Sequence, residues 1–238
     1  FFNPPQLMKL VEVIPGQKTQ QDIVNLTVDY VKSVKKEPVI CKKDVPGFIV
    51  NRLFIPMVHE ACWLKQRENL KMEEIDSAVK FNLGFPMGIF ELADFTGMDV
   101  IHKATIELQI RDKKVIFPHP DVEKLYNEKK LGQKSGEGFY KYSDEKYERV
   151  QLDETLAKRC NPISLAANIL NNAAWLVTNK ASDIAEIEKA AQLGLGLRKP
   201  IFDTAKEIGI KNIVNELNNL AKNYGKFYEP DPLLESMQ

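Results

Sequence analysis

The chain has 238 residues, enough for one large domain or two small ones, and its 33 Lys and Arg balance its 33 Asp and Glu. No block of like charge stands out, so electrostatics gives no support to a nucleic-acid or membrane-surface role. No apolar stretch approaches the length of a membrane-spanning helix. We therefore expect no nucleic-acid partner and no membrane partner.

The first 44 residues predict a strand, a helix and a second strand. Residues 9–14 are strand-like and end at Pro15-Gly16, residues 20–35 form an amphipathic helix with Thr19 as its N-cap, and residues 38–41 form another short strand. Two short strands are marginally stable alone. We therefore interpret this unit as the last part of a larger sheet.

After residue 44 the pattern becomes helical. The segment 48–67 is apolar on both sides, which predicts a buried helix. A glycine-rich turn follows at residues 132–138 and runs into an aromatic, strand-like end. The other predicted helices of this half are 72–82, 88–95, 98–111 and 121–130.

The second half repeats the first at a shift of 112 positions. The two tryptophans, Trp63 and Trp175, are related by this shift, and several apolar residues and glycines follow it without a gap. Two copies of one helical unit explain the pattern. Asn51 corresponds to Ile163, so the polar residues of interest do not repeat. We hypothesise that the second copy packs on the first as a built-in dimer partner.

The three cysteines, Cys41, Cys62 and Cys160, are widely spaced and odd in number. This argues against a disulfide framework and a zinc site and favours a reducing compartment. We expect them to be small buried residues, and we expect no metal ion and a cytoplasmic location.

Two polar residues could carry chemistry. Glu12 lies in an apolar strand, where alternation places it on the face of Leu10 and Ile14, so it is predicted to be partly buried and to need a partner. Asn51 lies in the first turns of an apolar helix. Taken singly, each residue has a simpler explanation. Glu12 could be a solvated acid, and Asn51 could be a satisfied hydrogen-bonding group.

Five motifs in order closely resemble the L-3-hydroxyacyl-CoA dehydrogenase family. The resemblance covers residues 1–142, and residues 161–238 resemble the second C-terminal domain of longer, multifunctional members. The motifs are Phe1-Phe2-Asn3-Pro4, the run Met8 to Ile14, Asp44-Val45-Pro46-Gly47-Phe48-Ile49-Val50-Asn51-Arg52, the run Gly84 to Asp94, and Gly132 to Tyr142.

The resemblance implies a mainly α fold. It consists of tandem helical domains, like the C-terminal domain of 6-phosphogluconate dehydrogenase, preceded by a short β-α-β remnant of a Rossmann-type domain. The expected boundaries are 1–44 for the remnant of the NAD-binding domain, 45–143 for the first helical copy, 144–160 for a linker and 161–238 for the second copy.

The resemblance also implies the reaction. Family members oxidise (S)-3-hydroxyacyl-CoA to 3-oxoacyl-CoA in fatty-acid β-oxidation, with NAD held by the N-terminal domain. A histidine directly before Phe-Phe-Asn-Pro is the base; Glu12 matches the catalytic acid that pairs with it, and Asn51 matches the substrate-binding asparagine. Imidazole suits this proton transfer, a carboxylate can orient the imidazolium, and an amide can donate to a substrate oxygen.

Two departures from the family pattern stand out. The 238 residues hold neither the base nor a Gly-x-Gly-x-x-Gly turn after a strand. Gly194-Leu195-Gly196 follows a helix, and Gly132 to Gly138 is predicted to be a tight turn. The histidines His59, His102 and His119 are expected to be structural or on the surface. We therefore expect this fragment alone to be inactive, without tight NAD binding.

Other interpretations remain open at this point. The chain could be a non-catalytic helical scaffold within a multifunctional protein, or, with less support, a related dehydrogenase of a non-CoA substrate. The expected small-molecule partner is an acyl-CoA substrate. The chain could also pair with a second copy of itself as a homodimer, or its two helical copies could form an intrachain pseudo-dimer instead. Residues 230–238 are interpreted as a linker, after which a fused enoyl-CoA hydratase domain could follow.

Overall fold

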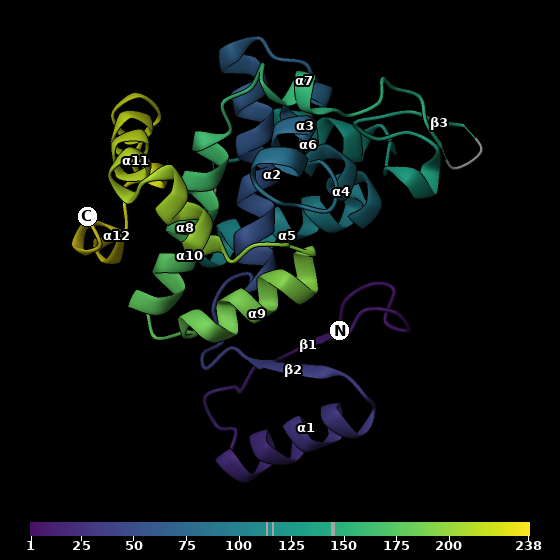
Figure 1. Ribbon diagram of the computed structural model, residues 1–238. Coiled ribbons are helices and arrows are strands. Elements are labelled where there is room, and N and C mark those ends of the chain that lie inside the picture. Colours follow the sequence, from purple (N-terminus) through teal and green to yellow (C-terminus); the bar gives the residue numbers. More distant parts are fainter. Residues whose placement is uncertain (113, 116, 144–145) are drawn as a thin grey trace.

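The computed structural model describes residues 1–112, 114–115, 117–143 and 146–238 (Figure 1). Helices make up most of the described chain, and the strands are few and short. One continuous apolar cluster runs through the helical body, and a second, small cluster lies between the first strand and the first helix. The expectation of a mainly helical fold is confirmed.

The N-terminal unit is a two-stranded parallel sheet with one crossover helix. Strand β1 (Leu10–Val13) pairs with β2 (Glu37–Ile40), and α1 (Gln21–Ser33) connects them. Val11 and Val13 pack on α1, whereas Leu10 and Ile14 belong to the main cluster on the opposite face. Figure 1 shows the sheet between α1 and α9 (Ile184–Leu195). The predicted alternation along β1 is thus confirmed.

Helix α2 (Val50–Glu68) forms the centre of the helical body. It is buried on nearly all sides because its residues are apolar all round, as predicted. Helix α8 (Ile163–Thr178) packs along it (Figure 1). The remaining helices of the first half are α3 (Met72–Asn82), α4 (Ile89–Thr96), α5 (Met98–Arg111) and α6 (Pro120–Asn127).

Short elements connect the two halves of the helical body. A 3₁₀ turn, η1 (Gln133–Ser135), precedes β3 (Tyr142–Ser143), which pairs with β4 (Lys146–Tyr147). Helix α7 (Glu154–Ala157) lies within the segment expected to be a linker and packs against α3. Residues 144–145, where that linker was expected to begin, lie outside the described residues.

The second half consists of helices that contact both the first half and the sheet. The backbone N–H of Ile40 donates to the Glu186 carboxylate at 2.8 Å, and that of Lys42 donates to the Ala181 carbonyl at 2.7 Å. The N-terminal unit is therefore attached directly to the second half. The elements of the second half that follow α8 and α9 are α10 (Ile201–Ile208), α11 (Ile210–Tyr224), η2 (Lys226–Tyr228) and α12 (Pro232–Ser236).

Two predictions about helix and chain ends are wrong. Thr19 is not the N-cap of α1, because its Oγ1 accepts a hydrogen bond from the Gly16 N–H and Gln20 occupies the N-cap position. The tail 230–238 is not an extended linker. It forms α12, Asp231 caps that helix by accepting from the Leu233 N–H, and Leu234 is completely buried.

Candidate active site

Glu12 lies on β1 and reaches the start of α2. Its Oε1 accepts hydrogen bonds from the backbone N–H of Ile49 at 2.8 Å and of Val50 at 3.1 Å. The first N–H groups of a helix have no intrahelical acceptor and carry the positive end of its dipole. The carboxylate that the sequence left without a partner is therefore bound by a helix terminus.

This environment acts on the acidity of Glu12 in two directions. Burial raises the pKa of the Glu12 carboxyl, because it takes the charged form out of water. The hydrogen bonds from Ile49 and Val50 favour the charged form and oppose that rise. The side chain itself is only half-buried, so it remains accessible to a further hydrogen-bonding group.

Asn51 follows these two residues in the first turn of α2. Its side chain is half-buried, and among the described residues none donates to or accepts from its amide. An amide offers both donors and an acceptor without titrating. Glu12 thus contacts, from β1, the turn of α2 to which Asn51 belongs, and Asn51 has no hydrogen-bond partner among the described residues.

The chain enters this turn through a tight bend at Gly47 and Phe48, whose φ angles are +75° and +49°. A Cβ on Gly47 would lie 2.8 Å from both the Arg52 backbone nitrogen and Leu108 Cδ2. Only glycine fits both the backbone conformation and the space. The Pro-Gly-Phe sequence therefore sets the position of the first turn of α2.

A hollow of about 400 Å³ runs along β1 and α1. Phe1, Glu12, Pro15 and Tyr30 are among the residues that border it, whereas Asn51 is not. The hollow places open space between β1 and α1, with Glu12 at its border. It is the part of this site that the sequence did not predict.

The glycine-rich segment 132–138 contacts a protein carboxylate. The N–H groups of Phe139 and Tyr140 and the hydroxyl of Tyr142 donate to Asp94 at 2.8, 2.9 and 2.8 Å. A Cβ on Gly138 would lie 2.1 Å from Asp94 Oδ1. Burial raises the pKa of Asp94 to about 6, against these hydrogen bonds. The predicted tight turn is confirmed, because the Ser135 N–H donates to the Gly132 carbonyl at 3.0 Å and the Gly132 N–H donates to the Glu137 carbonyl at 2.8 Å.

The histidines have structural surroundings. His59 is buried, bonded through Nε2 to Thr105 at 2.8 Å, and accepts the His119 N–H through Nδ1 at 2.9 Å. Burial, with smaller effects of His119 and His102, lowers the pKa of His59 to about 3, so it stays neutral. His102 stacks on Tyr126 with ring centroids 4.1 Å apart.

One cluster with metal-binding side chains was not predicted. Ligand atoms of Cys62, His119 and Asp121 lie within 4.8 Å of one another. Two of these groups already have protein partners, because His119 Nδ1 accepts the Asp121 N–H at 3.1 Å and Lys65 pairs with the Asp121 carboxylate at 3.1 Å. Positions 62 and 119 are too far apart for a spacing motif, so only the fold could reveal this group.

Across the part of the chain that the structure describes, no helix is long and apolar enough to cross a membrane. All three cysteines are free and buried, and their burial confirms the expectation of small buried residues.

Comparison with known proteins identifies both parts of the chain. The family model of the 3-hydroxyacyl-CoA dehydrogenase C-terminal domain matches residues 47–142 and 164–238, and the model of the NAD binding domain of the same family matches residues 1–45. A mouse relative named hydroxyacyl-coenzyme A dehydrogenase, mitochondrial, is 46% identical over 145 residues, which cover 60% of this chain and 46% of the relative. The chain thus spans about half the length of the curated relatives it matches.

Solved structures show the same fold over the whole chain. The 3-hydroxybutyryl-CoA dehydrogenase of Escherichia coli matches with a TM-score of 0.81 and 26% identity, covering 100% of this chain and 69% of that one. The dehydrogenase part of multifunctional enzyme 1 from Caenorhabditis elegans matches in fold, with a TM-score of 0.62 and 22% identity over 100% of this chain and 58% of the other. The family models match most of the residues, and the chain belongs to the 3-hydroxyacyl-CoA dehydrogenase family.

Proposed function

We propose that this chain is part of an NAD-dependent 3-hydroxyacyl-CoA dehydrogenase and supplies the acid and the amide that surround C3 of the substrate. The observation that carries the proposal is that Glu12 accepts hydrogen bonds from the start of α2, in the turn that includes Asn51. The acid is held by the N–H groups of Ile49 and Val50, and the next side chain along the helix keeps its amide free.

The roles of the two residues follow from their chemistry. Oxidation of the 3-hydroxyl requires loss of its proton as the hydride leaves, and the family resemblance assigns this proton to a histidine directly before Phe-Phe-Asn-Pro. Glu12 would orient that imidazole and stabilise the imidazolium, as a carboxylate does in a triad. Asn51 would donate to the oxygen on C3, which gains negative charge as the proton departs.

NAD would accept the hydride, but the 238 residues fit only a small part of its site. They contain no glycine-rich turn between a strand and a helix, and the glycine-rich segment at 132–138 lies beside Asp94. We propose that the 238 residues alone neither bind NAD tightly nor oxidise the substrate.

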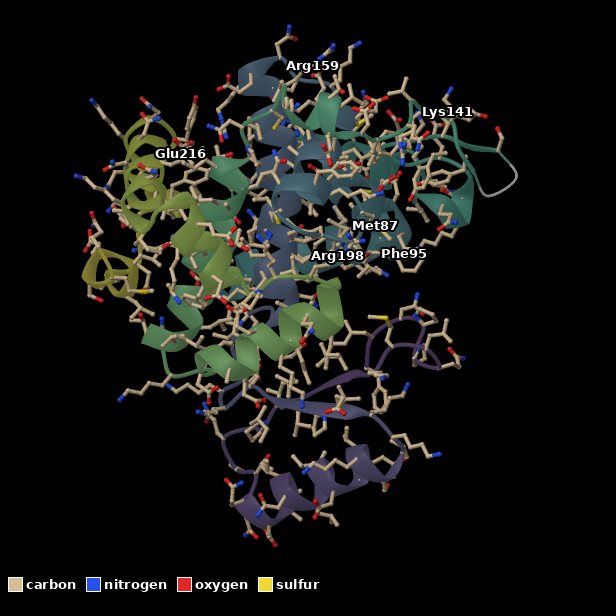
Figure 2. The ribbon with its side chains drawn as sticks, in the orientation of Figure 1. Met87, Phe95, Lys141, Arg159, Arg198 and Glu216 are labelled. Carbon is tan, nitrogen blue, oxygen red and sulfur yellow. The ribbon has the colours of Figure 1, made fainter. Side chains whose placement is uncertain are left out.

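An apolar surface on the helical body is suited to line the acyl chain. Met87 is half-buried and Phe95 is 47% exposed. Figure 2 shows both on the side of the helical body that faces the N-terminal unit. An exposed aromatic side chain and a half-buried methionine on this side are suited to contact an acyl chain.

We also propose the division into domains that the sequence suggested: 1–44, 45–143, 144–160 and 161–238, with the second helical copy packed on the first as an intrachain pseudo-dimer. The helix starts support two copies, because α3, α4 and α5 begin 112 positions before α9, α10 and α11. Helices α2 and α8, which correspond under the same shift, pack side by side.

A repeated helix cap supports the same division. Asp76 accepts from the N–H groups of Phe90 and Glu91, and Glu188, 112 positions later, accepts from those of Ile201 and Phe202. In both copies a carboxylate of one helix binds the first turn of the next. Sedimentation at equilibrium tests the pseudo-dimer: a mass of one chain is expected, and a dimer in which copy one packs only on copy one of a second chain would contradict it.

The location and the fused domain stay predictions. A cytoplasmic location was expected, whereas the curated mammalian relatives include several named mitochondrial. Mass spectrometry of the protein from its native cells would show both whether a leader is removed and whether an enoyl-CoA hydratase domain follows Gln238.

The decisive experiment measures NADH oxidation with acetoacetyl-CoA by the complete gene product. Glu12→Gln and Asn51→Ala are each expected to lower kcat by about 100-fold or more, because each removes a group that acts in the transition state. Glu37→Gln is the control, since Glu37 is an exposed acid on the same sheet that pairs with Lys189. Full activity of the Glu12→Gln variant would contradict the proposed site. An inactive complete gene product would favour the scaffold function.

A further inference from the structure

Arg52, the residue after Asn51, carries a buried charge that its surroundings only partly satisfy. Its side chain is 2% exposed, and its single hydrogen bond among the described residues runs from Nη2 to Asp112 Oδ2 at 3.3 Å. Nε and Nη1 have no partner there. Burial lowers the pKa of Arg52 to about 10, against the effect of Asp112, so the group stays charged at neutral pH.

The remaining support for this charge comes from the second half of the chain. The guanidinium carbon of Arg52 lies 3.2 Å from the centroid of the Trp175 ring on α8. Tryptophan gives the strongest cation–π contact of the aromatic side chains, and such contacts strengthen when they are removed from water. The planar guanidinium is also suited to stacking in a way that a lysine ammonium is not.

We propose that the stack of Trp175 on Arg52 positions the first turn of α2, and with it Asn51 and the N–H groups that hold Glu12. Both are positioning residues, because neither touches the reacting atoms. Neighbouring residues of a helix turn together, so a rotation that relieves an unsupported Arg52 would move the Asn51 amide as well. The catalytic consequence rests on the proposed function, whereas the structural consequence does not.

The repeat offers a matched control within the same chain. Trp63 corresponds to Trp175 under the shift of 112, but the position that corresponds to Arg52 is Ser164. Trp63 stacks instead on Phe117 at 4.8 Å and meets His119 edge-on at 4.4 Å. Replacing either tryptophan removes a large packed ring, but only one of them supports the turn that carries Asn51.

The structural test uses amide hydrogen exchange, followed by NMR, of the 238-residue chain. In Trp175→Leu the Ile49 and Val50 amides are expected to exchange at least about tenfold faster, because the turn that Glu12 binds loses its support. In Trp63→Leu they are expected to keep their rates, although both variants should melt earlier. Unchanged exchange in Trp175→Leu, or equal acceleration in both variants, would overturn the inference. If Trp175→Leu does not fold, Arg52→Lys replaces it, since it keeps the charge but loses the planar stack.

The catalytic test uses the complete gene product. Trp175→Leu is expected to lower kcat about tenfold or more through misplacement of Asn51, Trp175→Phe to recover most of that loss, and Trp63→Leu to keep kcat within about twofold. A kcat of Trp175→Leu within twofold of the unmodified protein would overturn the inference. If the unmodified protein is inactive but the exchange results hold, the proposed function fails and the positioning contact stands.

Discussion

Tyr228 donates its hydroxyl hydrogen to Glu60 Oε2 at 2.7 Å, joining the C-terminal part of the chain to the middle of α2. Glu60 is 1% exposed, and its other oxygen is paired with Arg67. Burial and the Glu60 charge raise the pKa of Tyr228, so the phenol remains a donor. A buried charge needs each of these partners.

Tyr228→Phe is therefore expected to lower the free energy of unfolding by about 1–3 kcal/mol, because one oxygen of Glu60 loses its donor. Urea denaturation measures the difference. Tyr30→Phe serves as the control, since Tyr30 is 62% exposed and should change stability by no more than about 0.5 kcal/mol. Equal effects of the two substitutions would show that the Glu60 contact adds nothing.

Gly88→Ala is expected to be among the most damaging small substitutions. A Cβ at this position would lie 2.0 Å from Cγ of Asp76, the carboxylate that caps α4. Displacing that cap should cost about 2–4 kcal/mol of unfolding free energy. At Gly16 the nearest atom to an added Cβ is Thr19 Oγ1 at 3.6 Å, so Gly16→Ala should be nearly neutral. A stable Gly88→Ala protein would mean that α3 and α4 can separate at little cost.

His59 should make the protein sensitive to acid. Its pKa is about 3 in the folded state and about 6.5 in an unfolded chain. Between these values the unfolded state binds a proton that the folded state does not, so stability is lost as the pH falls below about 6.5. The loss is at most about 1.4 kcal/mol per pH unit.

His59→Gln removes this titration but can keep one donor for Thr105 and one acceptor for the His119 N–H. We expect the unfolding free energy of His59→Gln to rise, relative to that of the unmodified protein, as the pH falls from 6.5 to 4.5. The comparison must be made between the two proteins, because the raised pKa values of Asp76 and Asp94 act in the opposite direction. A difference independent of pH would show that His59 is protonated in the folded state.

The tail provides a fourth prediction. Leu234→Ala should cost about 2–4 kcal/mol, because the side chain is completely buried against the main cluster. Glu235 is exposed in the next position, and Glu235→Ala should have little effect. Thermal unfolding followed by circular dichroism checks both. Equal stability of the two variants would restore the interpretation of residues 230–238 as a linker.

The sequence predicted the local features of the fold well because their causes are local. Helices α3 and α5 begin and end at the predicted residues, since apolar spacing and the flanking glycines or polar residues mark them. The tail was misinterpreted for the same reason. Two prolines and a short apolar pair in residues 230–238 are typical of a linker, and no local pattern indicates that Leu234 packs in the main cluster.

Glu12 and Asn51 stay predictions as site residues, and their contacts could not be predicted from the sequence. The resemblance identified Glu12 and Asn51, but the partner of Glu12 is a pair of backbone N–H groups 37 and 38 positions later, which have no side-chain signature. The two tryptophans suggested a repeat, yet only the fold placed Trp175 over Arg52. Contacts between distant segments depend on packing, which no local pattern records.

The attachment of β2 to the second half limits how the molecule can open and close. Besides the bonds from Ile40 and Lys42, the Lys189 ammonium donates to the Pro38 carbonyl at 3.2 Å and pairs with Glu37 at 3.0 Å. A hinge at residues 44–49 could swing the sheet away from α2 only by breaking these contacts with the second half and the hydrogen bonds from Ile49 and Val50 to Glu12. Strand β2, and β1 paired with it, should therefore move together with α9 when the molecule flexes.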